Sequence, residues 1–175
     1  MKKLLYATIF GWSLSALVFV LSVAKINIQE KIPFVWILFF GVFIVFIPAV
    51  LYAKNSNRIQ EYSYENNTFG NVPLIPFFEK SKSWIITILI VSFICAVVSF
   101  SSMNNLQNGS VESINGKYFM EERNNDKKRE ISKNEFDNFQ TSHLKFFFGG
   151  LLLFYSIPIL VYSKLIEWEN DEVNS

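Results

Sequence analysis

The sequence predicts an all-α membrane protein with four transmembrane helices and a small hairpin-plus-helix insertion between the third and fourth. The first observation is composition: hydrophobic residues make up 51% of the 175 residues and charged residues only 18%, against roughly 25% charged in an average soluble domain. The second is that four stretches contain no charged residue: 4–24, 32–53, 84–103 and 146–163. A helix needs about 20 apolar residues to cross the hydrocarbon core. One charge at mid-bilayer costs roughly 2.5–3.5 kcal/mol, so four uncharged stretches indicate four spans.

The first stretch has an alternative interpretation. Lys2 and Lys3 precede it, and it ends in Ser22-Val23-Ala24, which is similar to the end of a cleaved secretory signal. The apolar part of such a signal is typically about 7–15 residues long, whereas this stretch covers residues 4–24. The length favours an uncleaved span over a signal peptide.

The connection between the first two spans, residues 25–31, leaves room only for a tight turn between helices. Spans one and two are therefore expected to be antiparallel neighbours. Pro48 and Pro158 fall inside spans two and four and predict kinks, because proline removes a helix hydrogen bond.

Small residues indicate where helices pack closely. Ala7, Gly11 and Ser15 recur every four residues, and Gly149-Gly150 lies in the fourth span. Such a stripe lets a neighbouring backbone approach. The plainer interpretation is that small residues are simply common in membrane helices.

Basic residues near the span ends indicate orientation, because cytoplasmic loops are enriched in lysine and arginine. With both termini in the cytoplasm, the cytoplasmic set is Lys2, Lys3, Lys54, Arg58, Lys80, Lys82 and Lys164. The opposite set is smaller and consists of Lys25, Lys31, Lys117, Lys133 and Lys145. Long loops translocate largely regardless of charge, so the other basic residues of the third loop are not counted. The sequence predicts that both termini are cytoplasmic.

The chain therefore divides into residues 1–103 with three spans, a polar extramembrane domain at 104–142, and a fourth span with an acidic tail at 143–175. The cytoplasmic loop at 54–83 contains Pro73 and Pro76, which argue against a regular helix there. Its apolar part is expected to press onto the membrane surface.

The third loop is the only place for a folded polar domain. Asn115-Gly116 predicts a turn before a strand at 117–120, and a second turn at 124–126 would return the chain as a strand at 128–131. Ser132 and Glu135 have the spacing of a capping box. The helix after this box is expected to run on through His143 into the fourth span.

Few residues suggest chemistry. A net charge of +1 argues against nucleic-acid binding. The single cysteine, Cys95, lies within an apolar stretch and is expected to be inert. The single histidine, His143, is expected to lie at the lipid boundary with its ring reaching toward water. Metalloprotease, P-loop and zinc-finger spacings are absent from the sequence, so no catalytic residue, metal or cofactor is predicted. The spans also lack the ionisable groups of coupled transporters.

The order of two spans, a proline-bearing loop, a third span, a hairpin with Lys117-Tyr118 and an aromatic-rich fourth span resembles uncharacterised small bacterial four-span integral membrane proteins. In that group a basic residue, a glycine and a phenylalanine-tyrosine pair open the last span; here they match Lys145, Gly149 and Phe154-Tyr155. Gly150 and Leu151 stand where the group has histidine and tryptophan. The resemblance covers about the second half of the chain and implies a bacterial cytoplasmic-membrane protein without a transferable active site.

Three functions remain open. The first is a non-enzymatic contact protein, an accessory subunit or an immunity-type protein that meets the lipid bilayer through its spans and a protein partner through residues 104–142. The second is an oligomeric transport or permeation component, suggested by the prolines and small residues of the helices. The third is a membrane enzyme that uses His143, and it would require an acid such as Glu135 or Asp137 beside the imidazole.

Overall fold

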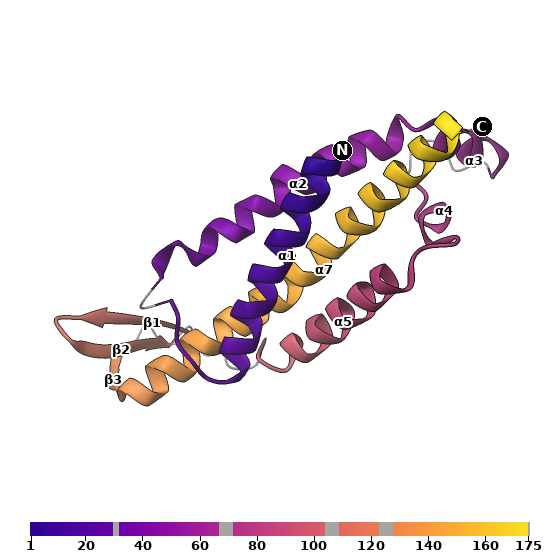
Figure 1. Ribbon diagram of the computed structural model, residues 1–175. Helices are drawn as coiled ribbons and strands as arrows, with labels where there is room; N and C mark the ends of the chain where they lie inside the picture. Colours follow the sequence, from indigo (N-terminus) through magenta and orange to yellow (C-terminus); the bar gives the residue numbers. More distant parts are fainter. Residues whose placement is uncertain (30–31, 67–71, 104–108, 123–127, 175) are drawn as a thin grey trace.

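The computed structural model describes residues 1–29, 32–66, 72–103, 109–122 and 128–174. Four of its helices are long and apolar enough to cross a membrane, as expected of a multi-pass membrane protein: Lys2–Val23, Phe34–Lys54, Ser83–Phe100 and Lys133–Glu172. They fall on the four uncharged stretches of the sequence. Both chain termini lie at one end of the bundle, and the strands lie at the other (Figure 1).

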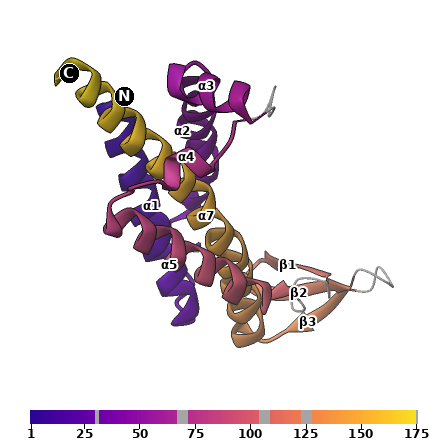
Figure 2. The same ribbon diagram turned by 90° about the vertical axis from the view of Figure 1, so that its right-hand side faces the viewer.

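One helix organises the bundle. Helix α7 (Lys133–Asn174) has 42 residues, and at 1.5 Å per residue it is about 60 Å long, roughly twice the thickness of the hydrocarbon core. Helices α1 (Lys2–Val23), α2 (Ile37–Lys54) and α5 (Ser83–Phe100) all pack against it (Figure 2). In the most apolar part of α7, 61% of the residues are buried, against 22–28% in the other three. The sequence therefore folds as three helices around a fourth.

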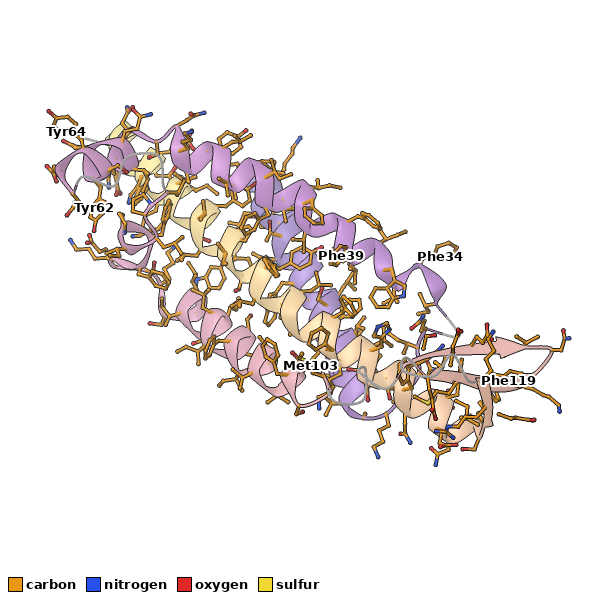
Figure 3. All side chains as sticks on the ribbon, turned by 180° about the vertical axis from the view of Figure 1, so that it is seen from behind. Phe34, Phe39, Tyr62, Tyr64, Met103 and Phe119 are labelled. Atoms are coloured by element: carbon orange, nitrogen blue, oxygen red, sulfur yellow. The ribbon has the colours of Figure 1, made fainter. Side chains whose placement is uncertain are left out.

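The surrounding helices keep one face covered and one face open. Large apolar side chains such as Phe10, Phe40 and Phe93 are mostly exposed on the outside of α1, α2 and α5. Phe34, in the short 3₁₀ helix η1 (Pro33–Trp36) before α2, also points outward (Figure 3). Exposing these side chains to lipid tails costs no free energy, whereas exposing them to water does.

The loop after α2 differs from the prediction. It contains α3 (Asn57–Glu65) and a single turn, α4 (Ile75–Phe78). The prediction that prolines exclude a helix is wrong for this turn, because Pro76 occupies a first-turn position, where its missing N–H has no helical partner. Phe77 does not press onto the membrane surface either: it is fully buried, with its ring 5.3 Å from that of Trp168 on α7.

The strands correct the all-α assignment and add one strand to the predicted hairpin. Strands β1 (Gly109–Ile114), β2 (Lys117–Glu122) and β3 (Lys128–Ile131) form a three-stranded antiparallel sheet in that order. The two strands of the predicted hairpin lie within β2 and β3. Asn115 and Gly116 both have positive φ (51° and 79°), as required by the two-residue turn that joins β1 to β2. The prediction placed this turn correctly but missed the strand before it. The predicted turn at 124–126 lies outside the described residues.

Candidate functional site

The sheet is fixed to the first turns of α7 by a small apolar core. Met120, Ile131 and Phe136 are buried together, and the Tyr118 ring lies 4.6 Å from that of Phe136. These strand residues share one face, because alternate side chains of a strand point to the same side. The sheet therefore has an inner face on α7 and an opposite, outer face.

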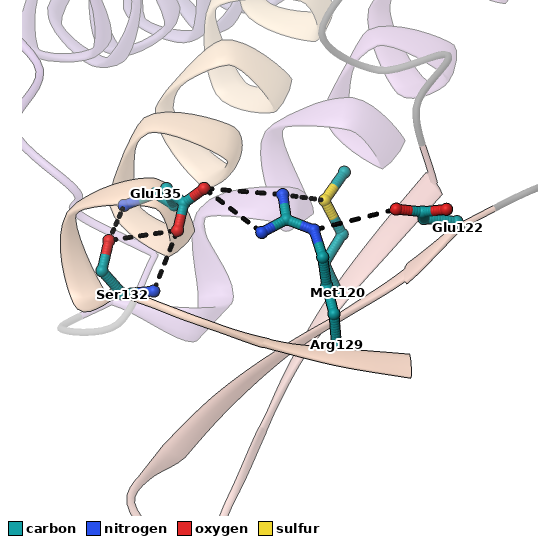
Figure 4. Close-up of polar contacts among 5 residues, drawn as sticks. All are labelled: Met120, Glu122, Arg129, Ser132 and Glu135. Carbon is teal, nitrogen blue, oxygen red and sulfur yellow. Dashed lines mark hydrogen bonds and ion pairs between the residues drawn. The ribbon is translucent and has the colours of Figure 1, made fainter. Parts of the chain in front are cut away.

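A polar network closes the same junction (Figure 4). The Ser132 N–H donates to a Glu135 carboxylate oxygen at 3.0 Å, and the Glu135 N–H donates back to the Ser132 hydroxyl at 3.2 Å. This is the predicted capping box. The hydrogen bond from the Ser132 N–H, with the charge of Arg129 as a further cause, lowers the pKa of Glu135. Arg129 lies 3.4 Å from Glu135 and 3.8 Å from Glu122, so it connects α7 to the sheet.

The connection between α1 and α2 is tied to the same part of α7. The Asn27 side-chain amide donates to Asp137 at 2.8 Å and to Gln140 at 2.7 Å. The sheet, the base of α7 and this connection thus form one polar unit at a single end of the bundle.

The outer face of the sheet combines one aromatic ring with paired charges. Phe119 lies in the central strand, and its cross-strand partners are Glu112 on β1 and Glu130 on β3. Lys128 forms ion pairs with Glu112 and Glu121, and Lys117 lies 3.5 Å from Glu130. Such exposed pairs add about 0–1 kcal/mol to stability. Phe119 is partly exposed on this surface (Figure 3).

The small residues singled out by the sequence have different positions. Gly11 lies against α7, where an added Cβ would come within 2.5 Å of the Tyr155 ring, and Ser15 is buried beside it on α1. Gly149 faces α5, where an added Cβ would lie 2.9 Å from the Cys95 carbonyl oxygen. Gly150 has no atom within 4 Å of such a Cβ.

Ala7 is exposed, and its neighbour Thr8 is fully buried instead. The buried stripe of α1 thus runs through Thr8, Gly11 and Ser15. The Thr8 hydroxyl donates to the Leu4 carbonyl oxygen at 2.7 Å, so a polar side chain is accommodated on the packed face.

Two tyrosines of α7 cross to α2. Tyr155 donates from its hydroxyl to the Leu38 carbonyl oxygen at 2.7 Å, and Tyr162 donates to the Val45 carbonyl oxygen at 2.8 Å. Both rings are almost fully buried. Neither contact could be predicted from the sequence, because spacing does not reveal which carbonyl a buried hydroxyl will meet.

His143 lies among aromatic rings. Its ring is 5.1 Å from that of Phe147, 6.0 Å from Trp36 and 6.1 Å from Phe139. The two acids that a histidine enzyme would need are bonded elsewhere, Glu135 to Ser132 and Asp137 to Asn27. Cys95 is a free, partly buried thiol on α5. No cluster of three or more potential metal ligands occurs within the described ranges.

A polar hollow of about 470 Å³ lies at the end that carries the termini, between α3, α4 and α7. Lys164 lines it and is 3% exposed, with its ammonium 2.9 Å from Glu167. The Arg58 guanidinium lies 5.5 Å from the centre of the Trp168 ring. Sequence reasoning assigned Lys164 only a role in orientation; its spacing of three residues from Glu167 was the available signal for a buried pair.

Comparisons with protein-family models, with curated proteins and with solved structures found no match for this chain.

Proposed function

We propose that this multi-pass membrane protein acts by contact rather than by catalysis, as an accessory subunit or an immunity-type protein that binds a partner protein through the outer face of its sheet. The observation that carries the proposal is the arrangement of that face. Phe119 stands at the centre, and three glutamates and two lysines surround it: Glu112, Glu121, Glu130, Lys117 and Lys128. An aromatic centre within a polar rim is the usual composition of an energetically important contact surface.

The firm attachment of the sheet to α7 supports this proposal. Tyr118 and Phe136 pack ring to ring, and Arg129 reaches both Glu122 and Glu135. A surface held in one position loses less entropy on binding than a mobile one. The fold therefore favours recognition by a preformed face.

The filled centre of the bundle makes permeation through one copy the weaker candidate. The side chains that fill it come from α7. At most 1% of the surface of Phe148, Leu152 and Ile159 is exposed, and at most 2% of the surface of Tyr155 and Tyr162. A polar pathway between these helices would have to displace them. A permeation role would thus need a pore between copies of the chain.

We further propose that the membrane is the bacterial cytoplasmic membrane, with both termini in the cytoplasm and the sheet outside. The larger basic set lies near the ends of the spans that share the side of the termini. The resemblance to small bacterial membrane proteins supports the choice of membrane, and the basic residues alone support the orientation. The partner would then be an extracytoplasmic protein or the outer part of another membrane protein.

Site-specific photocrosslinking in cells that naturally produce the protein tests the contact proposal. A photoreactive phenylalanine analogue replaces Phe119, and the matched control carries it at Tyr64, an exposed aromatic residue on α3 at the opposite end of the bundle. We expect one discrete protein adduct from position 119 that is absent from position 64. In a binding assay with the identified partner, Phe119→Ala is expected to weaken binding at least roughly tenfold. Truncation of a central aromatic residue typically costs about 2 kcal/mol or more of binding free energy. Adducts of equal pattern from both positions, or unchanged binding by the variant, would contradict the proposal.

A further inference from the structure

A second polar hollow, of about 350 Å³, lies at the sheet end of the bundle where three helices meet. It is distinct from the outer face of the sheet, and a ligand bound in it would not require the proposed partner protein. The end of α1, the end of α5 and the second to fourth turns of α7 contribute its lining, whose polar residues include Ser22, Lys25, Ser101, Ser102, Thr141 and Lys145.

The lining is cationic. Two lysines contribute to it, and the described residues that line it include no carboxylate. The Lys145 ammonium donates to the Ser101 hydroxyl at 3.2 Å. Within the described ranges, neither Lys25 nor Lys145 forms an ion pair, whereas the lysines of the sheet do. Asp137, one turn before Thr141 on α7, accepts a hydrogen bond from Asn27.

Neutralising the helix ends does not account for the two lysines. The C-terminal carbonyls of a helix attract cations, but two of those at the end of α1 are already bonded: Leu21 accepts from the Ile26 N–H at 2.9 Å and Ser22 from the Lys25 N–H at 3.1 Å. At the end of α5, Val98 accepts from both the N–H and the hydroxyl of Ser101. The Lys25 ammonium, and the N–H groups of Lys145 that do not donate to Ser101, therefore remain available to an external ligand.

The backbone at Lys25 adds to this argument. Its φ is +58°. Glycine usually occupies this left-handed conformation at the end of a helix, because a residue with a Cβ is strained there. A lysine at this position keeps a positive charge at the rim of the hollow.

The location of the hollow indicates the source of its ligand. The uncharged stretches of α1 and α5 end here, and the uncharged stretch of α7 begins at residue 146, directly after Lys145. The hollow is thus at the level of the lipid headgroups if these helices span the bilayer, and Val23 lines its rim. We propose that it binds the phosphate group of an anionic phospholipid, with Lys25 and Lys145 as the two cationic ligands.

Native mass spectrometry of the full chain in a non-ionic detergent tests this site. The purified protein is mixed with phosphatidylglycerol or, separately, with phosphatidylcholine at the same concentration, and the fraction retaining one lipid is measured. The test variant is Lys25→Gln/Lys145→Gln. The matched control is Lys2→Gln/Lys3→Gln, which removes two lysines from the opposite end of the bundle. A further variant, Lys25→Arg/Lys145→Arg, retains the charges, and circular dichroism verifies that every variant is folded.

We expect the wild type to retain phosphatidylglycerol in preference to phosphatidylcholine, and the control to behave as the wild type. Loss of each lysine is expected to reduce retention by roughly tenfold, because a charge-assisted hydrogen bond contributes about 1.5 kcal/mol or more. The arginine variant should retain the lipid. Equal retention by the test variant and the wild type would overturn the site, as would an equal loss in the control. Displacement of the lipid by millimolar inorganic phosphate would make free phosphate the ligand and overturn the assignment to lipid, whereas retention in phosphate supports a lipid headgroup.

Discussion

The hydroxyl of Tyr155 donates to the backbone carbonyl oxygen of Leu38 at 2.7 Å across the interface of α7 and α2. The ring reaches this carbonyl through space left by two glycines, Gly11 on α1 and Gly41 on α2, where an added Cβ would lie 2.5 Å and 2.7 Å from the tyrosine. One side chain of the central helix therefore fixes the positions of two surrounding helices. A hydrogen bond of this kind contributes to specificity as well as stability, because a buried hydroxyl needs a partner.

Gly11→Ala is expected to destabilise the folded protein in detergent by about 1–3 kcal/mol, because the new methyl group overlaps the Tyr155 ring and a packed interface does not absorb it freely. Gly150→Ala is the matched control, since it adds the same atom to a helix in open space. It should be neutral or stabilising by up to about 1 kcal/mol, the difference in helix propensity. The single thiol of Cys95 provides the measurement, through its labelling by a fluorogenic maleimide during heating. Equal midpoints for the two variants would contradict the packing argument.

Tyr155→Phe is expected to lower the free energy of unfolding by about 0.5–1.5 kcal/mol, because it removes the donor to the Leu38 carbonyl and retains the ring. The control is Tyr6→Phe, which removes a hydroxyl from an exposed ring on α1. Thermal midpoints followed by the Cys95 thiol compare the two. If Tyr6→Phe lowers the midpoint as much as Tyr155→Phe, the hydrogen bond to α2 is not what stabilises the interface.

Phe77→Ala and Phe78→Ala separate packing on α7 from contact with the membrane surface. Phe77 is fully buried against Trp168, whereas Phe78 is 47% exposed. Truncation of Phe77 should lower the free energy of unfolding by about 3–5 kcal/mol, and truncation of Phe78 should lower it much less. The measurement is the rate of limited proteolysis in the loop between α2 and α5. Faster cleavage in the Phe78 variant than in the Phe77 variant would restore the prediction that this segment presses on lipid.

The four long apolar helices could be predicted from the sequence because a helix that is able to span a membrane is specified by length and lack of charge, both of which are local properties. The same holds for the cap at Ser132 and Glu135, whose geometry follows from a spacing of three residues. The turn at Asn115-Gly116 is also local, because it needs two positive φ angles, which these residues adopt readily.

The features that were missed depend on contacts between distant residues. Strand β1 contains Gly109 and Ser110, which have little intrinsic preference for strands, and it is held by its pairing with β2. The burial of Phe77 is set by Trp168, some ninety residues further along the chain. Ala7 and Thr8 exchange roles on α1 because the rotation of a helix about its axis is fixed by its neighbours. The sequence of α1 has little amphipathic pattern, so no local feature specifies which of its faces is buried.

Acidification should weaken the junction between the sheet and α7 through Glu135. The hydrogen bond from the Ser132 N–H and the charge of Arg129 lower the pKa of this carboxyl below its ordinary value of 4.5. Since the folded state favours the ionised form, the stabilisation is present above the unfolded pKa and is lost as the pH falls through the lowered folded value. Glu135→Gln retains a side chain that can cap the helix but does not titrate. We expect near-ultraviolet circular dichroism to show a steeper loss of thermal stability on acidification in the wild type than in the variant. Identical pH profiles would show that the carboxylate does not contribute.

The two ends of the bundle should lie on opposite sides of the membrane. In a Cys95→Ser background, single cysteines replace Ile114 at the end of β1 and Gln60 on α3, both of which are exposed. An impermeant maleimide applied to intact cells is expected to label position 114 and spare position 60, and permeabilised cells provide the control that both thiols react. This result would place the sheet outside and direct the search to extracytoplasmic partners. Labelling of position 60 alone would invert the orientation, so that the outer face of the sheet would meet a cytoplasmic protein and the lysine-lined hollow would face the inner leaflet.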